Sequence, residues 1–302
     1  MSPPPAAPQA AGIAGDRPLH GIAATVAAMA TFAVVDGLAK WLVADASIFQ
    51  VVAIRSAIVL ALVCPIVLRA GGPAALATRR PYWHAARAAL AMLSILLYFE
   101  SLRHLPLATA SVLGSSAPLF MTALSTPLLG ERVGIHRWIA VIVGFIGVVV
   151  VAQPGGEVAD TRAAAMAVAS GLTYALSMIA MRWLTPTESD ASFVVYNNLG
   201  TLLIGAAALP FVWSPPPAVD LALTAAMGGA MVLGQLLMVR AFRLAPVSVV
   251  APFHYSDLVW AAAIGFVVWG DFPGPQVWTG AAIVVASGVY VVLREERTSA
   301  RP

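Results

Sequence analysis

Two pairs of polar residues stand in otherwise apolar stretches, at spacings that could support ion or proton chemistry. Asp36 and Lys40 are four positions apart, so on a helix they would share one face in the order that favours an ion pair. Such a pair could line a cavity and be split by a zwitterionic substrate, or it could be a structural ion pair. His254 and Asp257 are three positions apart and would share a face with Trp260. An acid in apolar surroundings beside a histidine is a candidate proton site, and the alternative is a mutually satisfied polar pair.

Arg55 and Glu100 are two further ionisable residues within apolar runs. A charge at the centre of a bilayer costs at least about 2.5–3.5 kcal/mol, so each needs a partner, water or a function. The fixed charge of Arg55 suits a carboxylate, whereas Glu100 could simply reach the outer interface. The ionisable groups expected within the apolar runs are Asp36, Lys40, Arg55, Glu100 and Asp257. Three acids against two bases leave one acid unmatched, which predicts coupling to protons or a cationic or zwitterionic substrate.

The elements that position these residues follow from composition. Hydrophobic residues make up 60% of the chain and charged residues only 10%, against about a quarter in soluble domains, which excludes a soluble fold. A hydrocarbon core needs about 20 apolar residues per spanning helix. Continuously apolar runs such as 141–151 favour helices over the alternating strands of a barrel. The fold class predicted is an all-α membrane protein with ten transmembrane helices, near residues 21–42, 48–68, 84–103, 106–129, 135–152, 164–183, 191–212, 220–241, 246–269 and 276–293.

An internal repeat with an offset of 140 residues divides the chain into halves. The matching residues are Arg103 and Pro106 with Arg243 and Pro246, Gly130-Glu131 with Gly270-Asp271, and Gly134 and Trp138 with Gly274 and Trp278. Because each unit has five helices, the second must enter the membrane in the opposite sense, which is the inverted repeat of many secondary transporters. The predicted domains are a disordered cytoplasmic tail (1–18), a first five-helix repeat (19–152), a second (153–293) and a cytoplasmic tail (294–302).

The arginines at the helix ends predict the topology. With both termini cytoplasmic, only Arg103 and Arg162 fall on the outer side, as expected if basic residues are retained in the cytoplasm. We therefore expect a multi-pass protein of the inner membrane. The net charge of +3 reflects this bias, and no nucleic acid partner is expected.

Two prolines and several polar residues complete the candidate cavity. Pro118 and Pro252 fall inside predicted spans, where each would kink a helix and free a backbone carbonyl. Ser111, Ser115 and Ser116 supply hydroxyls beside the first kink. Gly144, Gly147, Gly280 and Gly288 are expected to be close-packing points between helices. Further candidate cavity residues are Tyr98, Tyr174, Gln235 and Tyr255, although interhelical hydrogen bonding is an alternative role for Gln235.

Several sequence motifs bear a family resemblance. They are Leu105-Pro106-Leu107-Ala108, Ala117-Pro118-Leu119-Phe120, Leu129-Gly130-Glu131-Arg132, Gly234-Gln235, Arg240-Ala241-Phe242-Arg243-Leu244-Ala245-Pro246 and Pro252-Phe253-His254-Tyr255. With these, the chain after its tail resembles the drug/metabolite transporter (DMT) superfamily, specifically the ten-helix EamA-type bacterial carriers, and among them the S-adenosylmethionine carriers. The resemblance implies a proton- or exchange-coupled transporter of amino acids, vitamins, nucleotide-like metabolites or drugs.

The resemblance bears on individual positions as well. Related carriers keep an arginine at the position of Arg55, whereas Glu100 replaces an aromatic or small residue. Their acid often stands at the position of His254, and a small polar residue stands at that of Asp257. The acid has thus moved by three residues along the same helix face.

The function expected is secondary transport of a small polar metabolite by alternating access, with the two five-helix units rocking about a cavity lined by helices 1, 3, 4, 6, 8 and 9. A passive channel or an intramembrane enzyme acting on a lipid-linked substrate are the alternatives. We expect no enzymatic activity, metal or cofactor, since the spans contain neither clustered carboxylates nor grouped histidines. The partners expected are the substrate and the lipid bilayer, and the working unit is a monomer or homodimer.

Overall fold

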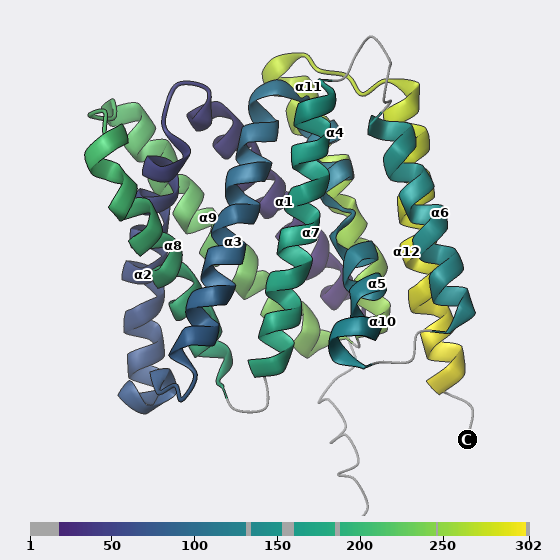
Figure 1. Cartoon of the computed structure of the whole chain (residues 1–302), viewed down its shortest axis with the longest axis horizontal. Coiled ribbons are helices and arrows are strands. Elements are labelled where there is room, and N and C mark those ends of the chain that lie inside the picture. The colour runs from purple at the N-terminus through teal and green to yellow at the C-terminus, as the bar shows by residue number, and fades with distance from the viewer. Residues whose placement is uncertain (1–17, 131–133, 153–159, 185–187, 246, 300–302) are drawn as a thin grey trace, which may run out of the picture.

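Ten helical segments cross the bundle in the computed structural model, which describes residues 18–130, 134–152, 160–184, 188–245 and 247–299 (Figure 1). Eight of them are unbroken helices: α1 (Pro18–Val43), α2 (Ile48–Gly71), α3 (Pro81–His104), α6 (Ile135–Ala152), α7 (Thr161–Leu184), α8 (Asp190–Val212), α9 (Ala218–Leu244) and α12 (Pro275–Ser299). A short 3-10 turn, η1 (Pro73–Leu76), connects α2 to α3. The all-helical membrane fold predicted from the sequence is confirmed.

The fourth and ninth predicted spans are broken rather than continuous. The fourth consists of α4 (Leu107–Gly114) and α5 (Ala117–Leu129), and the ninth consists of α10 (Val247–Val250), the 3-10 turn η2 (Ala251–Tyr255) and α11 (Ser256–Trp269). Among the described residues, eight helical stretches are long and apolar enough to cross a membrane, including Leu107–Leu129 as a whole. The shorter apolar stretch Phe253–Trp269 consists of the end of η2 and the whole of α11.

The packing partners of the helices follow an inverted twofold pattern. α1 packs along α9, and α3 packs along α7. If the halves are exchanged, α1 becomes α7 and α9 becomes α3, so one pair maps onto the other. The remaining large interfaces, α2 with α8 and α6 with α12, map onto themselves and lie toward opposite edges of the bundle (Figure 1). Helix packing thus agrees with two inverted repeats.

Small residues allow the closest of these interfaces. Where α6 meets α12, a Cβ added at Gly280 would lie 2.6 Å from the carbonyl oxygen of Gly147. The opposite face of α6 exposes Ile139, Ile142 and Ile146, which recur at helical spacing as expected for a surface in contact with lipid. α6 therefore packs through its glycines and turns its large aliphatic side chains outward.

The two broken spans end alike. Gly130 closes α5 and Gly270 closes α11, with φ values of 69° and 72°, a left-handed conformation that favours glycine. Gly130 and Gly270 are matching positions of the repeat with an offset of 140 residues. Two further residues of that repeat, Glu131 and Pro246, lie outside the described residues. The predicted tail at 1–18 also lies outside them except for Pro18, which begins α1, and the final helix continues to Ser299.

Candidate functional site

A cavity of about 340 Å³ lies inside the bundle. Its walls come from α1, α2, α3, α4, α7, α9, Ser115 between α4 and α5, and the first turns of α5 and α11. The predicted lining helices are all represented, and α2 joins them through Arg55. The polar side chains of the lining include Asp36, Arg55, Tyr98, Ser111, Tyr174 and Asp257.

Asp36 is held in place by a hydroxyl group. The Tyr98 hydroxyl donates a hydrogen bond to Asp36 Oδ2 at 2.9 Å and lies 3.3 Å from Ser111 Oγ. The Asp36 carboxylate also lies within electrostatic range of the Arg55 guanidinium. Arg55 is only 5% exposed, and its Nε has no hydrogen-bond partner among the described residues. Asp36 and Arg55 therefore place opposite charges on the lining of the same cavity.

Asp257 is the second carboxylate of the cavity. Its Oδ1 is buried without a hydrogen-bond partner among the described residues, and the neighbouring charge that it meets is Asp36. Two carboxylates and one guanidinium leave an excess of one negative charge. Because like charges repel strongly in a dry cavity, a proton or a cationic ligand group would be stabilised here.

The predicted ion pair between Asp36 and Lys40 is wrong. Lys40 Nζ donates instead to the carbonyl oxygens of Leu102 at 3.0 Å and Leu105 at 2.5 Å, and it lies 5.5 Å from the ring centroid of Trp269. These carbonyls end α3, where a cation is stabilised by the helix dipole. Lys40 therefore joins the end of α1 to the end of α3, and Asp36 is left to line the cavity.

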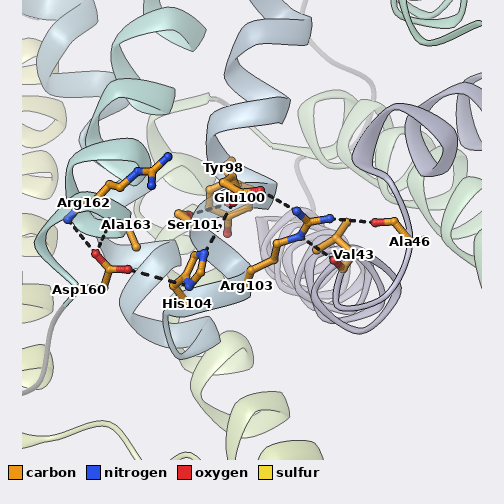
Figure 2. Close-up of polar contacts among 10 residues, drawn as sticks. All are labelled: Val43, Ala46, Tyr98, Glu100, Ser101, Arg103, His104, Asp160, Arg162 and Ala163. Carbon is orange, nitrogen blue, oxygen red and sulfur yellow. Dashed lines mark hydrogen bonds and ion pairs between the residues drawn. The ribbon is translucent and has the colours of Figure 1, made fainter. Parts of the chain in front are cut away.

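Glu100, a candidate cavity residue, lies at the surface of the bundle, which is the alternative position given for it above. Its carboxylate lies 2.9 Å from Arg103 Nη1 and 3.6 Å from His104 Nε2, and its side chain is 31% exposed (Figure 2). It lies near the end of α3, outside the cavity lining, because it is two residues beyond Tyr98 and therefore points to the other side of the helix. Neither Lys40 nor Glu100 therefore contributes a charge to the cavity lining. Asp36, Asp257 and Arg55 remain, so one acid is still unmatched.

Other predicted residues of the second half lie away from the cavity lining. Trp260 is 38% exposed, and Gln235 is a partly buried residue of α9. The ring of Tyr255 occupies the space beside Gly288 of α12. His254 is half-buried, and its role in proton transfer stays a prediction. Of the predicted proton pair, only Asp257 lines the cavity.

Both prolines lie where a helix begins again. Pro118 is in the first turn of α5, and Pro252 is in the first turn of η2, positions where the missing N–H costs no helical hydrogen bond. Ser115 Oγ donates to the carbonyl of Ser111 at 2.9 Å, beside the first break. Asp257 lies in the first turn of α11, where a negative charge is favourable. The breaks thus bring helix ends and polar groups to the cavity wall.

A buried polar cluster that sequence reasoning missed binds α3 to the second half. His84 Nε2 lies 3.3 Å from Glu188 Oε2, and Thr78 donates to Glu188 Oε1 at 3.0 Å. Burial opposes ionisation, but the hydrogen bonds from His84, Thr78 and the Arg79 amide hold the pKa of Glu188 below its usual value. Because His84 and Glu188 are 104 positions apart, no local pattern could reveal the pair.

Comparisons with known proteins find relatives that match almost the whole chain. The chain is 25% identical over 280 residues to the S-adenosylmethionine uptake transporter of Rickettsia prowazekii. This alignment covers 93% of this chain and 95% of that protein. It is 29% identical over 293 residues to the riboflavin transporter of Vibrio cholerae, in an alignment that covers 94% of this chain and 97% of that protein. It is 27% identical over 277 residues to the pseudopaline exporter CntI of Pseudomonas aeruginosa, in an alignment that covers 90% of this chain and 93% of that protein.

A solved crystal structure superposes with a TM-score of 0.61 over 91% of this chain and 99% of that chain, at 17% identity, and it supports the fold alone. The relatives named above are transporters, as expected for a chain that is not an enzyme. The family model of the EamA-like transporters matches residues 19–153 and 161–294. The protein is therefore a multi-pass membrane protein that belongs to the EamA-like transporter family.

Proposed function

We propose that the protein is a secondary transporter that carries a small polar metabolite through its central cavity by alternating access. The observation that carries the proposal is the charge of the cavity: Asp36, Asp257 and Arg55 face a shared space between two inverted repeats. Buried charges of this kind are costly in a membrane and are retained where they bind substrates or ions. The transport activities of the named relatives support the same function.

The cavity chemistry favours a zwitterionic or cationic substrate. Arg55 offers a fixed positive charge to a substrate carboxylate, and Asp257 offers an unpartnered carboxylate oxygen to a cationic group. S-adenosylmethionine has an α-amino acid group and a sulfonium cation, so it is the first of the relatives' substrates to test on this chain. Riboflavin, which is uncharged, serves as the contrasting substrate.

The excess negative charge also favours coupling to protons or to an exchanged substrate. When no cationic group occupies the cavity, a proton on Asp257 or Asp36 would relieve their repulsion, and a bound cation would displace it. The basic helix ends favour a bacterial inner membrane protein with both termini on the cytoplasmic side. α1 then crosses the membrane outward, so the end of the bundle where Lys40 lies faces the outside of the membrane.

Each of the two helix bundles that would move during transport contains helices from both repeats. Ser94 donates to the carbonyl of Ser170 at 2.9 Å, and Arg87 donates to that of Phe193 at 2.5 Å, so α3 is bonded to α7 and α8. α1 packs along α9. We therefore replace the rocking of two five-helix units with the rocking of an α3–α7–α8 bundle against an α1–α9 bundle.

The interface between α2 and α8 supplies the axis of this motion. Ser56 Oγ lies 3.0 Å from Thr201 Oγ1 at this interface. Gln50 exchanges two hydrogen bonds with the backbone of Ser214, at 2.8 Å and 3.0 Å. Since this interface maps onto itself when the repeats are exchanged, it can stay intact in both states.

Counterflow in proteoliposomes tests the proposal. Vesicles loaded with unlabelled S-adenosylmethionine should take up the labelled compound transiently above its external concentration, because a carrier exchanges substrate faster than it returns empty. An amino acid panel and riboflavin complete the substrates. Equilibration without overshoot for a permeant substrate would indicate a channel, and no movement of any substrate would contradict the proposed substrate class.

A further inference from the structure

Two basic side chains cross between the ends of α1 and α3. Lys40, near the end of α1, donates to the carbonyls that end α3. In return Arg103, at the end of α3, donates through Nε to the carbonyl of Val43 at 2.6 Å and through Nη2 to that of Ala46 at 2.9 Å (Figure 2). Each helix thus places a cation on the carbonyl end of the other. We call Lys40 and Arg103 the α1–α3 latch.

The second repeat carries basic residues at both matching positions. Arg103 recurs as Arg243 at the end of α9. Lys40 recurs as Arg182 near the end of α7, 142 positions later, and the surrounding sequence supports this match. The matching segments are Thr31-Phe32-Ala33 with Thr173-Tyr174-Ala175 and Lys40-Trp41-Leu42 with Arg182-Trp183-Leu184, both 142 positions apart, and Asp45-Ala46-Ser47 with Asp190-Ala191-Ser192, which are 145 positions apart.

The two repeats nevertheless differ in how these helix ends meet. α1 packs against α3, whereas α7 and α9 make no comparable contact within the parts of the chain that the structure describes. Arg243 is exposed and makes no hydrogen bond or ion pair to another described residue. The structure therefore contains one formed latch and, at the opposite end, the same residue types on helices that stand apart.

We propose that Arg182 and Arg243 form an α7–α9 latch when the transporter opens at the Lys40 end. In that state Arg182 binds the carbonyls that end α9, Arg243 binds those that end α7, and the α1–α3 latch is released. Inverted repeats can exchange conformations, and because the two latches have the same chemistry the two states can be close in free energy. The inference rests on the proposed alternating access and adds the residues that set its balance.

Cysteine accessibility tests the inference in the full-length protein. Cys64 is replaced by alanine, and Ile95→Cys, on the cavity wall, reports which end is open. The protein is reconstituted in one orientation, and a membrane-impermeant thiol reagent is applied at the Lys40 end. Arg103→Gln should raise the labelling rate and Arg243→Gln should lower it, each about three- to tenfold, as expected for losing one cation at a helix C-terminus.

A second matched pair and three controls make the result decisive. Lys40→Gln should act like Arg103→Gln, and Arg182→Gln should act like Arg243→Gln. Combining Arg103→Gln with Arg243→Gln should return the rate toward that of the parent, and lysine at either arginine position should keep it near the parent. Arg162→Gln, which removes an exposed cation at the Lys40 end, should leave the rate unchanged.

The outcomes separate the latch from alternating access. Opposite effects of the two pairs support the reciprocal latch. If only the Lys40 and Arg103 variants change the labelling, the reciprocal latch is wrong while alternating access stands. If no variant permits labelling from the Lys40 end, both the latch and the alternating cavity are overturned.

Discussion

The hydroxyl of Tyr98 donates a 2.9 Å hydrogen bond to the carboxylate of Asp36, joining α3 to α1 across the cavity. This bond makes the two cavity acids unequal. Asp36 has a protein donor and an arginine within electrostatic range, whereas Oδ1 of Asp257 has no partner among the described residues. Asp257 is therefore the acid best placed to meet a proton or a cationic group of the substrate.

Replacing Tyr98 by phenylalanine should slow uptake at saturating substrate by about tenfold. The change removes the donor to Asp36 while keeping the ring, and a hydrogen bond to a charged group contributes about 1.5–3 kcal/mol. Initial rates in proteoliposomes measure the effect. Tyr82→Phe is the matched control, since Tyr82 is 87% exposed and lies outside the cavity. Equal rates for the two variants would show that the bond to Asp36 does not position a transport residue.

Glu100→Gln should change the uptake rate by less than about twofold. Glu100 is paired with Arg103 at the surface of the bundle, and exposed ion pairs contribute only about 0–1 kcal/mol. The same initial-rate assay applies. A loss as large as that of a cavity variant would place Glu100 in the substrate path and contradict the cavity described above.

Glu188→Gln should destabilise the purified protein at neutral pH by about 1–3 kcal/mol, because buried hydrogen-bond donors lose a charged partner. The pKa of Glu188 is lower in the folded protein than its ordinary value of 4.5. Its ionised form therefore stabilises the fold fully above pH 4.5, and this contribution is lost as the pH falls through the folded-state pKa. Thermal unfolding of both proteins between pH 7 and pH 3 should show the difference shrinking. A constant difference would exclude ionised Glu188 as its source.

Gly280→Ala should destabilise the protein by about 1–3 kcal/mol, as overpacking does. The new Cβ would press on the backbone of Gly147, which cannot move aside as a flexible side chain can. Gly229→Ala is the control, since its Cβ would meet nothing within 4 Å in the middle of α9. The control should be neutral or more stable in thermal unfolding. Equal melting temperatures for both variants would refute close packing of α6 on α12.

Sequence patterns predicted the spans and the inverted repeat, because these depend on local composition and on matched positions such as Gly130 and Gly270. They predicted only a kink in the fourth and ninth spans, where the structure has a break before each proline. They also identified Arg55 and Asp257 as candidate cavity residues. They failed where a side chain could choose among partners. Lys40 was expected to bind Asp36, four positions away, but it reaches the carbonyl end of α3 instead. No helical spacing predicts a contact between segments that lie more than 60 positions apart.

The most direct test of the charged cavity compares wild-type protein with Asp257→Asn in proteoliposomes, using S-adenosylmethionine with and without an imposed pH gradient. Glu100→Gln is the matched acid-to-amide control outside the cavity. We predict that wild type and control accumulate substrate and respond to the gradient. Asp257→Asn, which keeps the shape but removes the charge, should lose more than about tenfold in rate and all response to pH, as expected for a buried charge that acts in transport. Unchanged uptake and unchanged pH response in Asp257→Asn would show that this acid is structural and would contradict the account of the cavity.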